Sequence, residues 1–100
     1  MRKYRSHDEY LEESLKNPKE AALYLSAAAD EKDPALLLVA LGHIAKAYGI
    51  SRMARRIALS RIGLYKTLSR KGNPEFRTLL RILEAAGLQL TFKPKIRKAA

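Results

Sequence analysis

A chain of 100 residues is long enough for one domain and too short for two full ones. Its 20 Lys and Arg outnumber 10 Asp and Glu, which gives a formal net charge of +10, and 47% of its residues are apolar, too many for a wholly disordered chain. The lack of cysteine excludes a disulfide framework, a thiolate nucleophile and Cys-based zinc sites. No apolar run approaches the roughly 20 residues of a membrane span, and residues 1–9 lack the apolar region of a secretory signal.

The positive charge lies in the last two thirds of the chain. Residues 1–33 hold six basic and eight acidic side chains, a net of −2, whereas residues 34–100 hold fourteen basic and two acidic ones, a net of +12. Such an excess attracts a polyanion, and double-stranded DNA is the expected one. A membrane surface is not expected, because the charge spreads over several elements rather than one amphipathic helix. The alternative is that the surplus of Lys and Arg only solubilises the fold.

Helix-capping residues divide the chain into six predicted helices. The expected N-caps are Ser6 (a Ser-x-x-Glu capping box with Glu9), Asn17 and Asp33 (each followed by proline), Ser51, Ser60, and Asn73 (again before proline). Gly49 and Gly87 are expected to end the third and sixth helices. The predicted helices after the first are 19–29, 35–48, 52–57, 61–69 and 75–86, the last with an apolar stripe at Phe76, Leu79, Leu80 and Leu83.

Beyond Gly87 the apolar period changes to that of a strand. Leu88, Leu90 and Phe92 alternate with polar residues. Because a single strand cannot satisfy its own ladder, we expect these three residues to pair with a second copy of the chain or with the sheet edge of a partner. The alternative is an extended tail whose apolar residues cover the helical core. The fold class expected from the whole pattern is all-α, with five or six helices and a short C-terminal strand.

Residues 51–69 have the pattern of a helix-turn-helix, in which the second helix enters the DNA major groove. Ala54 is small where the two helices cross, and Ala58 is small at the turn. Apolar residues at helical spacing supply the inward stripes of the two helices: Met53, Ile57, Leu64 and Leu68. The alternative is a plain helical hairpin whose basic face is only solvated.

The outward side chains of this segment are the candidate DNA contacts. Those expected to reach base edges are Ser60, Arg61, Ile62, Tyr65, Lys66 and Ser69. Those expected to contact phosphates, which position a protein without reading sequence, are Arg52, Arg55, Arg56, Lys71 and Asn73. Arg61 suits a bidentate contact with guanine or a contact with a phosphate. A homodimer would place two such helices about 34 Å apart on successive major grooves.

Several segments together carry a resemblance to a known family. They are Tyr10-Leu11, Asn17-Pro18-Lys19-Glu20-Ala21-Ala22-Leu23-Tyr24-Leu25, Asp33-Pro34, Leu59-Ser60-Arg61, Leu64-Tyr65-Lys66-Thr67-Leu68-Ser69, Lys71-Gly72-Asn73-Pro74 and Leu79-Leu80-Arg81-Ile82-Leu83. Residues 34–87 resemble the phage-repressor (Cro/cI, Xre-type) helix-turn-helix domain. The wider stretch 10–92 resembles the addiction-module antidote family, a HigA-like group of antitoxins. Ala58 departs from the repressor pattern, which most often has glycine at the turn.

The resemblance implies the antitoxin of a type II toxin–antitoxin module. Such a protein neutralises a RelE/ParE-like toxin and represses its own operon by binding operator DNA, in the bacterial cytoplasm on the nucleoid. The acidic N-terminal helices and the 88–92 segment are the candidate toxin contacts. The alternative for the acidic helices is that they only pack on the domain. The implied division is 1–33 as an N-terminal helical extension, 34–87 as the DNA-binding domain, 88–93 as the strand and 94–100 as a basic tail.

Two other readings of the chain stay open: a stand-alone prophage-type regulator, and a protein-interaction module with incidental DNA affinity. No enzyme, cofactor or metal site is expected. His7 and His43 lie 36 positions apart, no Gly-rich phosphate loop is present, and at least three of the six serines are placed as helix caps. We expect His43 to be a partly buried or interface histidine and His7 to be exposed.

Overall fold

The computed structural model describes residues 7–96, and the regular secondary structure in this part of the chain is all α-helix, which confirms the predicted all-α class but not the predicted strand. Its six helices are α1 (His7–Leu15), α2 (Pro18–Asp30), α3 (Pro34–Tyr48), α4 (Ile50–Arg56), α5 (Arg61–Thr67) and α6 (Phe76–Ala85). The predicted cap Ser6 lies outside the described residues.

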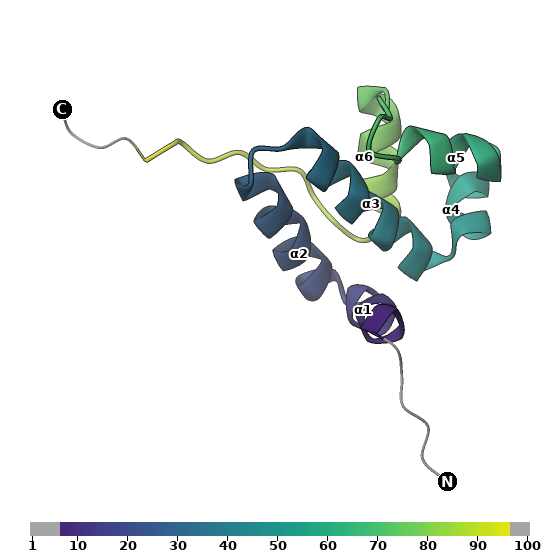
Figure 1. The fold of residues 1–100 in the computed structure, drawn as a ribbon, viewed down its shortest axis with the longest axis horizontal. Coiled ribbons are helices and arrows are strands. Elements are labelled where there is room, and N and C mark those ends of the chain that lie inside the picture. The colour runs from purple at the N-terminus through teal and green to yellow at the C-terminus, as the bar shows by residue number, and fades with distance from the viewer. Residues whose placement is uncertain (1–6, 97–100) are drawn as a thin grey trace, which may run out of the picture.

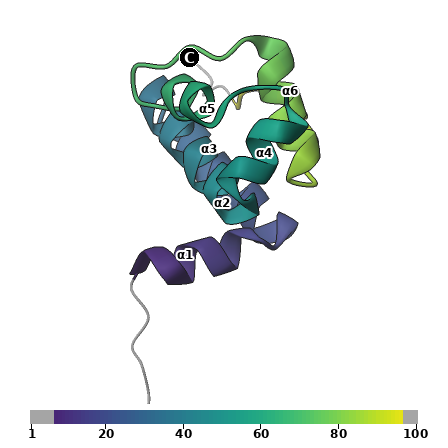
Figure 2. The same ribbon diagram turned by 90° about the vertical axis from the view of Figure 1, so that its right-hand side faces the viewer.

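α3 is the central helix of the fold. It contacts α1 and α2 on one side and α4 on the other, and α4 in turn contacts α5 and α6. Figure 1 shows α2 and α3 side by side, with α4, α5 and α6 grouped together beyond α3. Figure 2 shows α1 lying across the end of this arrangement. None of the described helices is by itself long and apolar enough to span a membrane, and α3 with α4 meets the length and composition criteria only as a pair bent by 100°.

Three of the predicted N-caps are confirmed by their hydrogen bonds. The Asn17 Oδ1 atom accepts from the amide of Lys19 at 2.9 Å, and the Asp33 Oδ1 atom accepts from the amide of Ala35 at 3.0 Å. The Ser60 Oγ atom accepts from the amide of Gly63 at 2.9 Å. Each bond satisfies a backbone donor that the first turn of a helix leaves unpaired.

Two predicted N-caps are wrong. Gly49, at φ +111°, ends α3 and is also the N-cap of α4, so Ser51 lies inside the first turn of α4 rather than before it. Asn73 and Pro74 belong to the loop before α6, because Glu75 keeps an extended backbone (ψ 149°) and the helix begins only at Phe76. In both places the position of the helix is fixed by the buried residues further along it, and the local cap signal does not decide it.

The end of α6 is a Schellman motif, as its glycine suggests. Gly87 has φ +78°, the amide of Leu88 donates to the carbonyl of Leu83 at 2.8 Å, and the amide of Gly87 donates to the carbonyl of Glu84 at 3.0 Å. Glycine adopts this left-handed conformation without a steric cost. Residues 88–96 therefore leave the helix in a defined direction.

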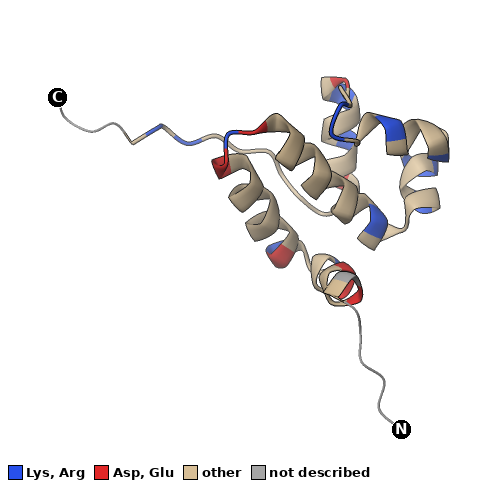
Figure 3. Ribbon diagram, viewed as in Figure 1, with Lys and Arg blue, Asp and Glu red and all other residues tan. Residues whose placement is uncertain are grey.

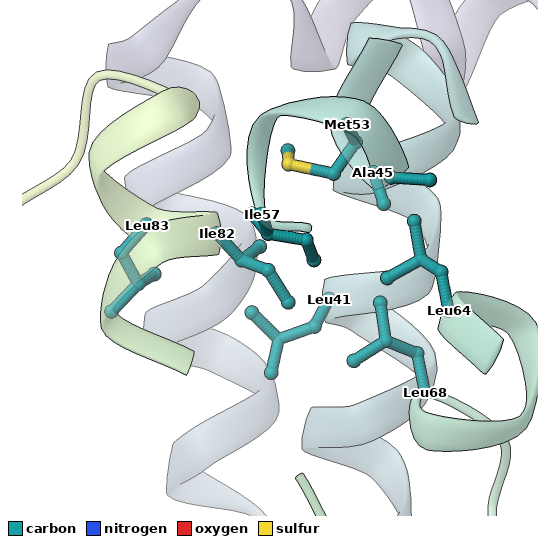
Figure 4. Close-up of a cluster of buried hydrophobic side chains, with 9 residues drawn as sticks. Leu41, Ala45, Met53, Ile57, Leu64, Leu68, Ile82 and Leu83 are labelled. Atoms are coloured by element: carbon teal, nitrogen blue, oxygen red, sulfur yellow. The ribbon is translucent and has the colours of Figure 1, made fainter. Parts of the chain in front are cut away.

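One apolar cluster joins α3, α4, α5 and α6. Figure 4 shows its side chains converging from these four helices and from the residues that follow α4 and α5. Its buried members are Leu41, Ala45, Met53, Ala54, Ile57, Leu64, Leu68, Ile82 and Leu83. Complete burial of an aliphatic side chain contributes about 1.5–3 kcal/mol, so this cluster holds the two short helices α4 and α5 against α3.

A second cluster joins α1 and α2 to α3. It consists of Leu15, Ala21, Ile44 and Ala47, and Leu25 and Leu88 pack against both clusters. The hydroxyl of Tyr24 and the Nδ1 atom of His43 form a hydrogen bond of 2.6 Å between α2 and α3. The half-buried position of His43 is the one predicted, and its ring helps to fix α2 on α3.

The expected strand at 88–93 does not form in the single chain. Residues 88–96 have no regular secondary structure. Figure 1 shows them as a drawn-out segment that passes α3 and α2 and then leaves the body of the molecule. The reason is the one that makes a lone strand unstable: within residues 7–96 there is no second strand to complete the ladder.

Candidate nucleic-acid interface

α4 and α5 are joined by residues 57–60, in which Ala58 adopts the left-handed conformation at φ +61°. The amide of Leu59 donates to the carbonyl of Ala54 at 2.9 Å, and the amide of Ala58 donates to the carbonyl of Arg55 at 3.3 Å. This is again the hydrogen-bond pattern of a Schellman motif, with alanine at the position that glycine usually takes. An L-residue in this conformation is strained by about 1–2 kcal/mol.

Replacing Ala58 by glycine should therefore stabilise the chain by about 1 kcal/mol, because glycine removes the strain. Ala58 is exposed, so the substitution leaves no cavity. Urea denaturation measures the change. The matched control is Ala27→Gly in the interior of α2, where an exposed alanine has an ordinary helical environment and glycine should cost about 1 kcal/mol. A loss of stability from Ala58→Gly similar to that control would show that residue 58 is not left-handed in solution.

The predicted inward residues of α4 and α5 are buried. Met53 and Leu64 have no exposed surface, and Ile57 and Leu68 are nearly as well buried. Leu64 is the buried residue within α5 itself, two positions from the exposed Ile62. α5 is thus held by one side while the other faces solvent.

The outward face of α5 carries four exposed side chains: Arg61, Ile62, Tyr65 and Lys66. Ile62 is 73% exposed, which is unusual for a large aliphatic residue on a short helix. The guanidinium of Arg61 lies 6.0 Å from the ring centroid of Tyr65, and its Nη1 atom donates to Ser51 Oγ at 3.4 Å. These contacts hold Arg61 at the first turn of α5, next to the first turn of α4.

The two serines predicted as base contacts are engaged within the fold. The hydroxyl oxygen of Ser60 is the N-cap of α5, and the hydroxyl of Ser69 donates to the carbonyl of Lys66 at 2.9 Å. Ser69 also lies beyond the end of α5, which stops at Thr67. Arg61, Ile62, Tyr65 and Lys66 are therefore the better candidates of the original six.

Tyr48 brings two of the predicted phosphate-contact residues together. The guanidinium of Arg52 lies 4.3 Å from the centroid of the Tyr48 ring, a cation–π distance, and Arg52 Nη1 donates to the Tyr48 carbonyl at 3.5 Å. Arg56 Nη1 donates to the Tyr48 hydroxyl at 3.2 Å. The hydrogen bond and positive charge of Arg56 lower the pKa of Tyr48 from its usual value near 10, and Arg52 acts in the same direction.

The other three phosphate candidates are exposed. The side chain of Arg55 has no hydrogen bond or ion pair with any described residue and extends from the last turn of α4. Lys71 and Asn73 lie in the loop between α5 and α6. The loop needs Gly72 between them, because a Cβ atom there would overlap the backbone of Thr67. The structure thus brings Arg52 and Arg56 together and leaves Arg55, Lys71 and Asn73 separate from that pair.

The charges divide in space as they do along the chain. In Figure 3 the Lys and Arg positions gather on α4, α5, α6 and the loop between α5 and α6, whereas the Asp and Glu positions lie mostly on α1 and at both ends of α2. Glu9, Glu12 and Glu13 of α1 and Lys46 of α3 line a hollow of about 280 Å³. Lys16 pairs with Glu13 at 3.4 Å on this surface.

We predict that two tyrosines titrate on opposite sides of pH 10. Burial raises the pKa of Tyr24, while Arg56 lowers the pKa of Tyr48. Tyr24 therefore contributes stability that is lost as the pH rises through its raised pKa, and Tyr48 contributes stability that is present above pH 10 and lost as the pH falls through its lowered pKa. The ¹³Cζ shifts of the two rings measure both titrations. Arg56→Gln should return the pKa of Tyr48 toward 10 and leave the pKa of Tyr24 unchanged. A Tyr48 pKa that does not move in this variant would contradict the Arg56 contact.

Comparison with known families assigns the chain. Residues 6–94 match the family described as "Probable addiction module antidote protein". The chain belongs to this family of addiction module antidotes. A relative of this antidote from Haemophilus influenzae (strain Rd), described as an uncharacterized protein, is 44% identical over 77 residues, which is 77% of this chain and 79% of the relative. No solved structure matches the antidote.

Sequence reasoning missed two residues of the antidote's candidate interface. Tyr48 was expected only as the end of a helix and Ser51 only as a cap, yet Tyr48 holds Arg52 and Arg56, and Ser51 holds Arg61. The spacing Tyr48, Arg52, Arg56 is that of one helix face, but Gly49 interrupts the helix, so the pattern predicts no contact by itself. Among residues 7–96 no three His, Asp or Glu side chains are placed to hold a metal ion.

Proposed function

We propose that this antidote is the antitoxin of a type II toxin–antitoxin module, which binds operator DNA as a homodimeric autorepressor and neutralises a RelE/ParE-like toxin. α4 and α5 act as the helix-turn-helix of a Cro/cI-type domain, with α5 in the major groove. Binding to the operator would place the protein on the nucleoid of a bacterial cytoplasm. Family membership supports the antitoxin role and a toxin partner in general.

The observation that carries the DNA-binding proposal is the outward face of α5. Arg61, Ile62 and Tyr65 are exposed on a helix that is fixed through Leu64, so a base edge would meet preplaced side chains. Arg suits the acceptors of guanine, and Ile suits the methyl group of thymine. Arg52 and Arg56, held by Tyr48, and the free Arg55 supply positive charge for phosphates on the flank.

The acidic surface of α1 is the proposed toxin contact. Glu9, Glu12 and Glu13 line one hollow on the α1 side of the molecule, away from the basic α4–α6 region. A basic partner would be attracted here, while DNA would be repelled. One chain can therefore hold DNA and toxin on different surfaces.

Gel-shift titration tests the DNA-binding part. The probes are the DNA upstream of the chain's own gene and a shuffled sequence of equal length, at one salt concentration. A specific repressor should prefer its operator by about 10³-fold or more. A ratio near one would favour a protein-interaction module with incidental DNA affinity.

Co-purification tests the antitoxin part. A RelE/ParE-like toxin encoded next to this chain should co-purify with it, and the growth inhibition by that toxin should be relieved when both are expressed. Glu9→Lys with Glu13→Lys should weaken this complex and leave the preference for operator DNA intact. Specific DNA binding without any such complex would favour the stand-alone prophage-type regulator.

A further inference from the structure

The segment after α6 exposes apolar side chains that nothing in the described chain covers. Leu88 packs against both apolar clusters, but Leu90 is 39% exposed and Phe92 is 88% exposed. The three residues alternate, so in an extended backbone their side chains lie on one face. Residues 88–93 are named here the arm, and Figure 1 shows the segment after α6 passing α3 and α2 before it leaves the body of the molecule.

An apolar hollow lies beside the start of the arm. It has a volume of about 320 Å³ and lies among α2, α3, α6 and the arm itself. Leu25, Leu37, Leu79 and Leu83 supply its walls, and residues 88–91 form one side. The chain thus carries an apolar hollow and, one residue beyond its rim, the exposed ring of Phe92, which does not line it.

We propose that two copies of the chain pair their arms as antiparallel strands centred on Leu90, so that Phe92 of each copy covers the hollow of the other. The register follows from the positions. When Leu90 lies opposite Leu90 of the second copy, Leu88 of each copy lies opposite Phe92 of the other. All three residues stay on one face because the side-chain period is two. Leu88 borders the hollow, so this pairing brings the partner's Phe92 to it. The inference rests on the homodimer of the proposed function and specifies its interface.

A second copy is the occupant that the charges favour. The arm ends in Lys93, is followed by Lys95 and holds no acidic residue, so it would repel the basic surface of a toxin. In the antiparallel register these lysines run toward the end of the partner's α6. That end carries the exposed carboxylate of Glu84, which attracts cations. Because the arrangement is two-fold symmetric, each copy makes the same contacts with the other.

Disulfide cross-linking tests the register, because the chain has no cysteine of its own. In Leu90→Cys the two new thiols face each other across the two-fold axis at a Cα separation of about 4.5–5.5 Å, within the range that a disulfide bridges. In Thr91→Cys they are diagonal neighbours about 7–8 Å apart. In Lys93→Cys each new thiol lies opposite position 87 of the other copy, six residues away from the second thiol. We expect efficient oxidation to a dimer for Leu90→Cys, weaker cross-linking for Thr91→Cys and none for Lys93→Cys.

Sedimentation equilibrium without DNA measures the dimer itself. Phe92→Ser should raise the dimer dissociation constant at least tenfold, whereas Ile96→Ser, an equally exposed position outside the paired region, should not. A dimer that forms without cross-linking at Leu90 would overturn the arm pairing and leave the homodimer intact. A wild-type chain that stays monomeric, with Phe92 on its own hollow, would overturn both. Neither result depends on operator preference, which the gel shift measures separately.

Discussion

Replacing Leu64 by alanine is expected to destabilise the folded chain by about 2–5 kcal/mol. Leu64 is completely buried and is the inward residue of α5, a helix of seven residues. It packs in the cluster with Leu41, Met53 and Ile82. A chain of this size is stable by about 5–15 kcal/mol, so the loss is a large fraction of the total.

The matched control lies two positions away on the same helix. Ile62→Ala also removes an aliphatic side chain from α5, but Ile62 is 73% exposed, so the change in the free energy of unfolding should stay within about 0.5 kcal/mol. Urea denaturation of both variants measures the difference, with the slope m checked for constancy. Similar losses from the two variants would mean that α5 is packed by a different face.

The second large effect is expected from Arg61→Ala. A bidentate contact between arginine and guanine discriminates by about 1–3 kcal/mol, so the preference for operator over random DNA should fall by about 5- to 150-fold. Arg61 is exposed at the first turn of α5, and its removal costs the fold only a 3.4 Å hydrogen bond to Ser51 and the contact with Tyr65. The thermal stability of the Arg61→Ala variant should therefore stay close to that of the wild type.

Arg55→Ala is the comparison that separates base reading from phosphate contact. Arg55 is exposed on α4 without a partner among the described residues, so its loss should weaken operator and random DNA by the same factor. The slope of log K against log salt should also decrease by about one. Equal losses on both DNAs from Arg61→Ala would assign Arg61 to a phosphate instead.

Much of the fold follows from local chemistry. Asn17-Pro18 and Asp33-Pro34 predict their helices correctly because the cap side chain and the fixed proline φ act within three residues. Ala58 was placed at the turn, where the related pattern has glycine, and its backbone there is left-handed at φ +61°. The division of charge at Asp33-Pro34 also reappears in space, since α1 and α2 lie opposite α4–α6 across α3.

Features that depend on tertiary packing were not predictable from local patterns. The apolar stripe of α6 was expected to include Phe76 and Leu80, yet Phe76 is 60% exposed and Leu80 is also exposed, while Ile82 is fully buried. The stripe is rotated because α6 packs through Ile82 and Leu83 against the cluster around α4. The contacts of Tyr48 with two arginines cross the break at Gly49, which no single-helix pattern represents.

The strand is the clearest case of a pattern whose outcome depends on a partner. Leu88, Leu90 and Phe92 have the correct period, but a strand needs a second edge that the single chain does not supply. An assembly that covers the apolar face would account for both the sequence pattern and the exposed Phe92. The arm pairing proposed above is such an assembly.

The central claim is that α5 reads DNA sequence, and the most direct test is the specificity ratio, the dissociation constant for random DNA divided by that for operator DNA. It should be measured by gel shift at one salt concentration for the wild type, Arg61→Ala and Arg55→Ala. We predict a high ratio in the wild type, a ratio lowered by about 5- to 150-fold in Arg61→Ala, and an unchanged ratio in Arg55→Ala. A wild-type ratio near one, or a ratio lowered by Arg55→Ala and not by Arg61→Ala, would contradict the claim.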